Sequence, residues 1–366
     1  MIRLNLIEMP MPTGSKNPDI LLSWILDTIG LVKRKSESWE DAELGALHRI
    51  MKDALLLEPL KGWDTRDLGD VCGLSQTGMH HQMVKLRDSG LVSSESYGRW
   101  HIYVLRGGSI TASINLLSIQ ARGIMELRMI ELGKYIHLSK ERMEFLNDRG
   151  EINFKIKVSE PSPSKKGHDR LDSLIEDLGL NGDRTKNEDE LAKNIFIELS
   201  TSVNPITILS IAEKLSETRS RVRRTIDRFR SSGIVERVPM FDRIAQDIFS
   251  GIIRQYDARG EEWLRTRGGL GRIDDEIANK LLEATKSKNL SIKKVENFLK
   301  PLPIESQKIL LNTLGGRMPF GFIISGQDGE EVKQIVMTKV ERILRRLNTV
   351  AERLDKALLE DYADNS

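Results

Sequence analysis

The sequence predicts a mainly α-helical protein with small β-hairpins, an α+β fold, on three grounds. Several long stretches repeat apolar residues at spacings of three and four, which is the period of an amphipathic helix. Short apolar and β-branched runs follow stretches that end in glycine, as at Gly90 and Gly233. Aromatic residues make up only 5% of the chain, which disfavours a large all-β sandwich.

Composition narrows the class of protein further. The 366 residues allow two or three domains with ample core. No run approaches the ~18 apolar residues of a membrane span, and residues 1–20 lack the pattern of a signal peptide. The single Cys72 excludes an internal disulfide and fits a reducing compartment, so we expect a cytoplasmic protein. Because the net charge is only +2, any affinity for nucleic acid must come from local patches.

The first predicted domain covers residues 1–150 and begins with two segments of different character. Residues 1–16 contain two prolines and predict an irregular arm, whereas the apolar run from Ile20 to Val32 predicts a buried helix. The segment from Ser38 to Leu57 has apolar residues at helical spacing, and Ser38 with Asp41 suggests a capped start. We expect this helix to pack beneath the segment that follows.

The segment from Asp64 to Leu105 predicts a short helix, a tight turn, a second helix and a β-hairpin. Thr65 can cap the first helix, and Gly73 allows the turn. Ser75 or Thr77 can cap the second helix, which carries one apolar stripe of Met79, Met83 and Leu86. This order of elements is that of a winged helix-turn-helix, whose second helix fits the major groove of DNA.

The same segment resembles a known family. GLSQTGMHHQMVKLRDSGLV followed by YGRWHIYVL is similar to the reading helix and wing of the ArsR-like winged-helix repressors, over roughly forty residues. Thr77 stands where that family usually has proline, and His80 where it often has serine. The resemblance implies the DNA-binding fold, but not metal sensing, because Cys72 alone cannot replace the family's metal-binding cysteine pair.

A long helix is predicted after the hairpin, from Ser113 to Leu146, ending at Asn147 to Gly150. Two interpretations stay open: the helix pairs with its twin in a dimer, or it packs on its own domain. Residues 151–189 are predicted to form a linker, since they are rich in proline, serine and charge. Within the linker we expect a short strand in INFKIKV and a short helix in LDSLIEDLGL.

The pattern repeats in a second predicted domain, residues 190–267. LAKNIFIELS predicts a first helix, Pro205 begins a positioning helix, and Ser216 or Thr218 caps a second candidate reading helix that ends at Gly233. This copy is more similar to MarR and related winged-helix proteins. IIRQYDARGEEWLRTRG resembles the return strand of a wing followed by a helix, and the preceding FDRIAQDIFSG is either an extended wing or an inserted helix, with its spacing favouring helix.

Residues 268–366 predict a helical C-terminal region. Gly268 to Arg272 lacks the context of a nucleotide-binding loop, and we interpret it as a hinge. Residues 274–314 predict helices broken at two prolines, and MPFGFIISGQDGEE predicts a small hairpin. Glu330 to Tyr362 repeats apolar residues by four and three over about three heptads. We therefore favour self-association through a coiled-coil-like helix, and thus a homodimer, over intramolecular packing.

The first reading helix offers polar side chains off its apolar stripe. Glutamine can bond adenine through two hydrogen bonds, serine and threonine suit phosphates or base edges, and an arginine at the hairpin tip can enter the minor groove. The alternative is that these are ordinary solvent-facing residues. The candidate DNA contacts here are Ser75, Gln76, Thr77, His80, His81, Lys85 and Arg99.

The second reading helix is far more basic. Six guanidinium groups on one short helix, opposed there only by Asp227, can neutralise phosphates and give binding with steep salt dependence. Arginine is also the usual reader of guanine. The alternative is ion pairing with acidic stretches of the same chain, such as EDAE or NEDE. The arginines are Arg219, Arg221, Arg223, Arg224, Arg228 and Arg230, and Ser220 joins them as a candidate DNA contact.

No catalytic or metal-binding pattern is recognisable. His80 and His81 are adjacent and point about 100° apart on a helix, so they cannot easily share one metal ion. Asp274, Asp275 and Glu276 are most simply acids at a helix start, favoured by the helix dipole. We expect no cofactor, no metal and no enzymatic activity.

The preferred function is a dimeric, sequence-specific regulator of transcription that binds double-stranded DNA in the nucleoid. A dimer would present four reading helices, so its site should be long and roughly palindromic. The alternative is an architectural or protein-docking factor with protein partners in the transcription, replication or chromosome-segregation machinery. We expect no membrane partner.

Overall fold

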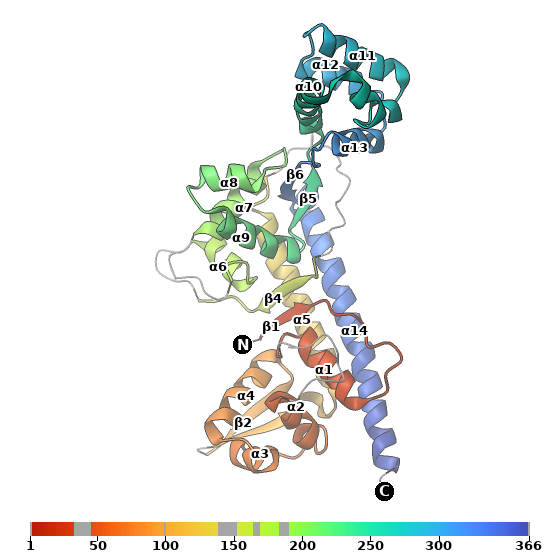
Figure 1. The fold of residues 1–366 in the computed structure, drawn as a ribbon. Helices are drawn as coiled ribbons and strands as arrows, with labels where there is room; N and C mark the ends of the chain where they lie inside the picture. The colour runs from red at the N-terminus through yellow and green to blue at the C-terminus, as the bar shows by residue number, and fades with distance from the viewer. Residues whose placement is uncertain are drawn as a thin grey trace.

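The protein is mainly α-helical, with three two-stranded antiparallel sheets among the residues that the structure describes (Figure 1). This computed structural model describes residues 2–32, 45–98, 100–137, 152–163, 169–182 and 190–364. Within these ranges, no helix has both the length and the apolar character needed to cross a membrane.

The first half of the chain runs from a short strand to a long helix. It contains β1 (Arg3–Ile7), α1 (Pro18–Thr28), α2 (Ala46–Ile50) with a π-helical turn (Met51–Leu55), α3 (Thr65–Cys72), α4 (Gln76–Ser89), the hairpin of β2 (Val92–Tyr97) and β3 (Trp100–Leu105), and α5 (Ile110–Gly133). Side chains fix where the helices begin: Asn17 caps α1, Asp64 rather than Thr65 caps α3, and Ser75 caps α4.

The second half repeats this order. It contains β4 (Lys155–Ser159), α6 (Arg170–Asp177), α7 (Leu191–Thr201), α8 (Ile208–Lys214), α9 (Arg219–Ser231), the paired strands β5 (Val235–Pro239) and β6 (Phe320–Ile324), and α14 (Gly329–Asp364). Strand, helix, three helices, two paired strands and a long helix therefore occur twice. The chain therefore contains an internal structural repeat, to which we refer as the duplication.

Equivalent hydrogen bonds confirm the correspondence between the halves. Trp63 exchanges two backbone hydrogen bonds with Tyr103, and Ile206 exchanges two with Phe322. Each of these bridges joins the residue two positions before the second of the three helices to the return strand of the hairpin. Gly90 and Gly233 follow the ends of α4 and α9, and both have positive φ. Many α-helices end in this way, with a glycine in the left-handed conformation directly after the last turn.

The segments that include α1 and α6 also share sequence. LSWILDTIGL at residues 22–31 matches LDSLIEDLGL at residues 171–180 in its glycine and in every apolar position except Trp24, which aligns with Ser173. A Cβ on Gly30 would lie 2.7 Å from Cβ of Asn5, and a Cβ on Gly179 would lie 2.8 Å from Cβ of Lys157. Both glycines have positive φ, so each turn needs glycine for conformation and for space.

Equivalent elements of the two halves pair with each other in antiparallel fashion. β1 pairs with β4, and Asn5 lies opposite Lys157 at the centre of the register. α5 packs along α14, and Arg122 bonds Glu341, which lies equally far from the start of its own helix. Antiparallel pairing of equivalent elements is what a two-fold axis produces. The two halves are therefore related by a pseudo-two-fold axis through both pairs, and they share one apolar core.

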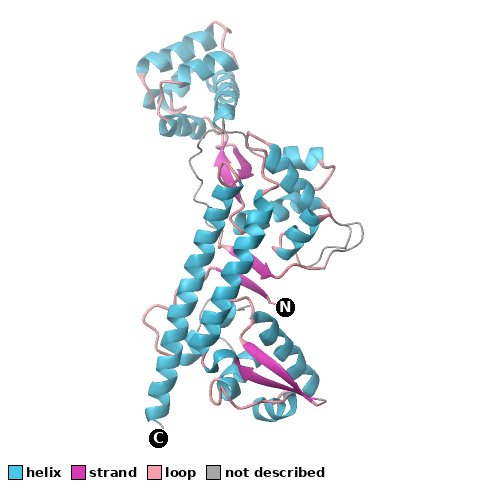
Figure 2. Ribbon diagram, turned by 180° about the vertical axis from the view of Figure 1, so that it is seen from behind, coloured by secondary structure: helices cyan, strands magenta, loops and turns pink. Residues whose placement is uncertain are grey.

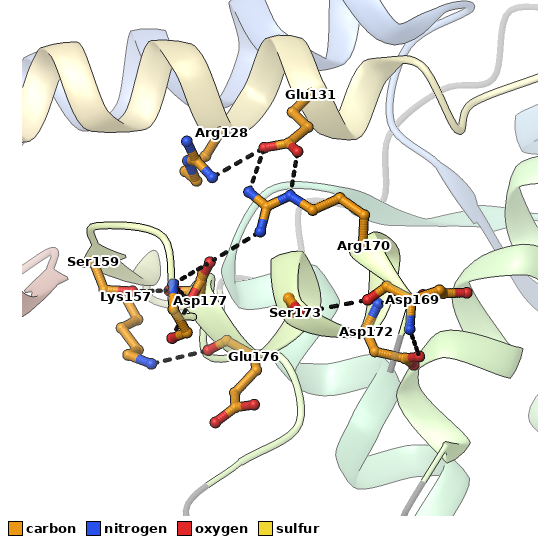
Figure 3. Close-up of polar contacts among 11 residues, drawn as sticks. Arg128, Glu131, Lys157, Ser159, Asp169, Arg170, Asp172, Ser173, Glu176 and Asp177 are labelled. Carbon is orange, nitrogen blue, oxygen red and sulfur yellow. Dashed lines mark hydrogen bonds and ion pairs between the residues drawn. The ribbon is translucent and has the colours of Figure 1, made fainter. Parts of the chain in front are cut away.

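The first helix of each half packs on the long helix of the other half, which strengthens the association of the two halves. α1 of the first half packs on α14, and α6 of the second half packs on α5. Figure 3 shows the polar side of the second contact. The guanidinium group of Arg170 on α6 donates two hydrogen bonds, one to each carboxylate oxygen of Glu131 on α5, and Arg128 donates to the same carboxylate at 3.0 Å. These cations hold the pKa of Glu131 below its ordinary value, chiefly through the bond from Arg170.

The pair at the pseudo-axis gives a test of the arrangement. We expect Arg122→Glu to destabilise the chain by about 0.5 kcal/mol, a small effect because the pair is partly exposed, and the double variant with Glu341→Arg to restore stability. The bond from Arg122 holds the pKa of Glu341 below its usual value. The carboxylate therefore contributes stability above the ordinary glutamate pKa, and the contribution disappears as the pH falls through the lowered value. Urea denaturation at neutral and acidic pH measures both effects, and additive single substitutions would contradict the pairing.

A separate helical domain interrupts the second half between β5 and β6. It contains α10 (Phe241–Thr266), α11 (Asp275–Lys286), α12 (Ile292–Leu299) and α13 (Ile304–Thr313). This inserted domain has its own apolar core, distinct from the core of the two halves. Pro239 and Phe320 are paired directly, so the domain enters and leaves the hairpin at one point (Figure 1).

Several sequence predictions are corrected by these pairings. The predicted irregular arm, residues 1–16, contains β1, and the predicted linker, residues 151–189, contributes β4 and α6 to the shared core. Ser38 and Asp41, the predicted capped start, lie outside the described residues. The predicted helix from Ser113 to Leu146 begins at Ile110 and has ended by Gly133, and its C-terminal residues also fall in a range that is not described.

The second and third predicted regions are also divided differently. FDRIAQDIFSG is helical, as its spacing favoured, but IIRQY continues the same helix α10 and is not a return strand. The return strand is β6, from the segment predicted as a local hairpin. Gly268 and Gly269 are buried in the inserted domain, so they do not form an exposed hinge. The apolar seam of the last helix is buried against α5 and α1 of the same chain, which contradicts self-association through that seam.

Candidate nucleic-acid interface

α4 presents the polar face that its sequence predicted. Met79, Met83 and Leu86 are fully buried beneath it. The Ser75 hydroxyl accepts from the backbone N–H of Gly78 at 3.3 Å and so fixes the start of the helix. Gln76, Thr77, His80 and His81 are exposed, and Lys85 is half-buried. The structure therefore brings these five candidates to one exposed helix surface, next to Ser75.

α9 is built in the same way on the second half. Val222, Ile226 and Phe229 are fully buried, and the Phe229 ring stacks on Phe196 of α7 with 6.1 Å between ring centroids. Thr218 caps the helix. Because the stripe is anchored on α7, the polar side of α9 is turned to solvent, and its first turn carries exposed Arg219 and Ser220.

The arginines of α9 fall into two groups, and the first group faces solvent. Arg219, Arg223 and Arg224 are exposed. Arg224 donates to the backbone carbonyl of Ser220 at 3.2 Å. In the part of the chain that the structure describes, no carboxylate pairs with any of these three side chains. Their charge is available to a polyanion, which is the requirement for release of counterions from DNA.

The second group of arginines is engaged within the chain. Arg221 binds both carboxylate oxygens of Glu217, at 2.6 and 2.7 Å. Arg228 is half-buried and donates to the carbonyl of Asn181 at 3.1 Å. Arg230 lies 3.5 Å from Asp227. The predicted alternative of ion pairing thus holds for Arg221 and Arg230, through acids that lie next to or within α9. EDAE and all of NEDE except Glu190 lie outside the described residues.

The duplication aligns the two helices residue by residue. The equivalent pairs, taken from the shared start of each helix, are Ser75 with Thr218, Gln76 with Arg219, Thr77 with Ser220, His80 with Arg223, His81 with Arg224 and Lys85 with Arg228. The same exposed surface therefore carries amides, hydroxyls and imidazoles in one half and guanidinium groups in the other.

The arrangement of the two units sets both helices near the pseudo-axis. α4 packs against β1, and α9 packs against β4. Both units lie on the same side of the α5–α14 pair, one on either side of the β1–β4 sheet (Figures 1 and 2).

The two hairpins differ more than the two helices do. In the first hairpin, Tyr97 next to the tip is 77% exposed and His101 on the return strand is also exposed, while Arg99 lies outside the described residues. Tyr97 and His101 were not among the predicted contacts. Tyr97 shares a strand face with the exposed Ser93 and Glu95, so the alternation of β2 could have identified it. His101 shares a face with the buried Tyr103 and Leu105, so alternation gives no such signal for it. In the second hairpin, the inserted domain replaces the tip, and Arg237 stacks on Phe320 at 3.7 Å from the ring centroid.

The described residues contain no cluster of three or more His, Cys, Asp or Glu side chains able to hold a metal ion. Cys72 is buried, and burial raises the pKa of its thiol, which makes the thiolate scarcer at neutral pH. The exposed residues of α4 and α9 offer hydrogen bonding and cationic attraction. Comparison with known proteins finds no matching family model, no similar curated protein and no similar solved structure.

Proposed function

We propose that this protein is a regulator of transcription that binds double-stranded DNA and catalyses no reaction of its own. In this proposal each half carries a winged helix-turn-helix module, with α4 and α9 as the helices that enter the major groove. The observation that carries the proposal is the pair of equivalent, exposed, polar helices on either side of a pseudo-two-fold axis. A DNA duplex has the same two-fold symmetry in its backbone.

In this proposal a single chain supplies the two reading helices that a symmetric regulator obtains from two subunits. The two helices are chemically unlike, so the preferred site should have two unlike halves. Gln76 and Thr77 suit adenine and thymine edges, whereas Arg219 and Arg223 suit guanine and phosphates. We propose that α9 supplies most of the affinity and α4 much of the selectivity.

Titration of labelled duplexes across salt concentrations tests this function. We expect the full chain to bind random-sequence duplex at about 50 mM salt, with log K falling by roughly 0.9 for each phosphate neutralised per tenfold rise in salt. Selection from a random duplex pool should then recover a site with unlike halves. If no duplex is bound even at low ionic strength while protein partners are captured, the protein-docking alternative replaces the proposal.

A further inference from the structure

α5 carries a second apolar face that nothing in the described structure covers. Leu116, Ile119, Leu127 and Ile130 are 37%, 62%, 61% and 44% exposed. They follow one another along a single side of the helix at helical spacing. Gly123 lies between them, and a Cβ at this glycine would meet no atom within 4 Å. A row of exposed large apolar residues of this kind on one element typically marks an interaction surface.

The fold itself does not require this apolar face. The equivalent positions of α14 follow from the matched starts of the two helices, and they are Ile335, Thr338, Arg342, Arg346 and Thr349. On α14 this face is therefore mostly polar, and Arg342 and Arg346 bind Glu8 at 2.8 and 3.2 Å. The two halves share their architecture but differ here, so the apolar residues of α5 serve something outside the duplicated fold.

The spacing of the face is symmetric about Gly123. Leu116 and Ile130 lie seven residues before and after the glycine, and Ile119 and Leu127 lie four residues before and after it. If two copies of α5 cross in antiparallel fashion at Gly123, Leu116 meets Ile130 and Ile119 meets Leu127 from both sides. An isologous contact requires this kind of self-complementarity, and a partner of unrelated sequence does not. Glycine at the crossing point allows the two backbones to approach closely.

Polar residues beside the face complement each other in the same register. Gln120 and Glu126 lie three residues before and after Gly123. Arg106 donates to the Gln120 side chain at 2.7 Å. In the antiparallel crossing, Glu126 of one copy comes opposite Gln120 of the other and next to its Arg106, which brings unlike charges together on both sides of the crossing point.

We propose that this face of α5 binds a second copy of the chain, through an antiparallel α5–α5 contact centred on Gly123. The dimer so formed is distinct from the one expected from the C-terminal helix, whose seam is already filled within the chain. It does not depend on DNA binding. If the chain also binds duplex DNA, the assembly carries four reading helices.

Measurement of molecular mass in solution tests the proposal directly. Light scattering after gel filtration should give a dimer for the full chain, and Ile119→Glu should give a monomer with an unchanged melting curve. Thr338→Glu, at the equivalent exposed position of α14, is the matched control and should leave the dimer intact. A wild-type monomer over the accessible concentrations, or a dimer that Ile119→Glu leaves intact, would overturn the proposal.

Cross-linking tests the register. In a Cys72→Ala background, oxidation of a mixture of Leu116→Cys and Ile130→Cys chains should give the mixed disulfide dimer, because antiparallel pairing brings these two positions together. Leu116→Cys alone should not cross-link. Efficient self-cross-linking of Leu116→Cys would indicate a parallel contact and contradict the proposed geometry. Neither readout involves DNA, so failure here is distinguishable from failure of the proposed function.

Discussion

Replacing Arg219, Arg223 and Arg224 together with alanine should weaken duplex binding on the order of 100-fold or more at moderate salt. These three side chains are exposed on α9, and within the described residues they have no carboxylate partner. Each of them that neutralises a phosphate should contribute about 0.9 to the slope of log K against log salt. The variant should therefore bind more weakly and also respond less to salt, as measured by fluorescence anisotropy over a series of salt concentrations.

A charge-matched control separates this effect from general electrostatics. The exposed cations chosen are Lys134, which directly follows α5, and Arg345 and Lys356 of α14. Their joint replacement by alanine removes the same formal charge but should change affinity and slope far less. If the control weakened binding as much as the α9 variant, the affinity would come from net charge and α9 would not be the main contact.

Phe229→Ala should lower the free energy of unfolding by about 3–5 kcal/mol. The ring is fully buried, stacks on Phe196, and lies in the core that both halves share. Differential scanning calorimetry should show the transition of the duplicated body moving down by roughly 10 °C. The inserted domain has a separate core, so a second transition should stay at its original temperature.

Two further variants control this experiment. Leu86→Ala, at the position of α4 equivalent to Phe229, should shift the same transition, because the halves melt as one body. Leu281→Ala, in the core of the inserted domain, should shift only the other transition. Movement of both transitions in every variant would show that the two cores unfold cooperatively and contradict this division.

The helices of the candidate interface were predictable because their signals are local. Ser75 and Thr218 are capping residues at fixed distances from an apolar stripe, and Gly90 and Gly233 end both helices. The pairing of Arg221 with Glu217 joins residues four apart in the sequence, with Glu217 just before the Thr218 cap, so it too has a local signal. No local signal shows that Arg219, Arg223 and Arg224 lack a carboxylate partner within the described residues, because this depends on which acids the fold brings near them.

The long-range pairings could not be predicted from local pattern. A strand of alternating residues does not specify its partner, so nothing near residues 1–16 indicates that β1 pairs with β4. β5 and β6 are separated by a whole domain. The heptads of α14 predict that it packs against another helix, but they do not say whether that helix belongs to the same chain or to a second copy. In the structure, α5 and α1 of the same chain pack against it. The available signal was the repeat between residues 22–31 and 171–180.

Arg122 and Glu341 occupy a place that a dimer of identical subunits cannot fill with unlike charges. On a true two-fold axis each residue meets its own copy, so arginine would face arginine. In one covalent chain a substitution changes one half and leaves the other as it was. The pairing of β1 with β4 and of α5 with α14 then preserves the shape, while α4 and α9 are free to diverge. A single polypeptide thus allows α4 and α9 to carry different exposed side chains without rebuilding the scaffold.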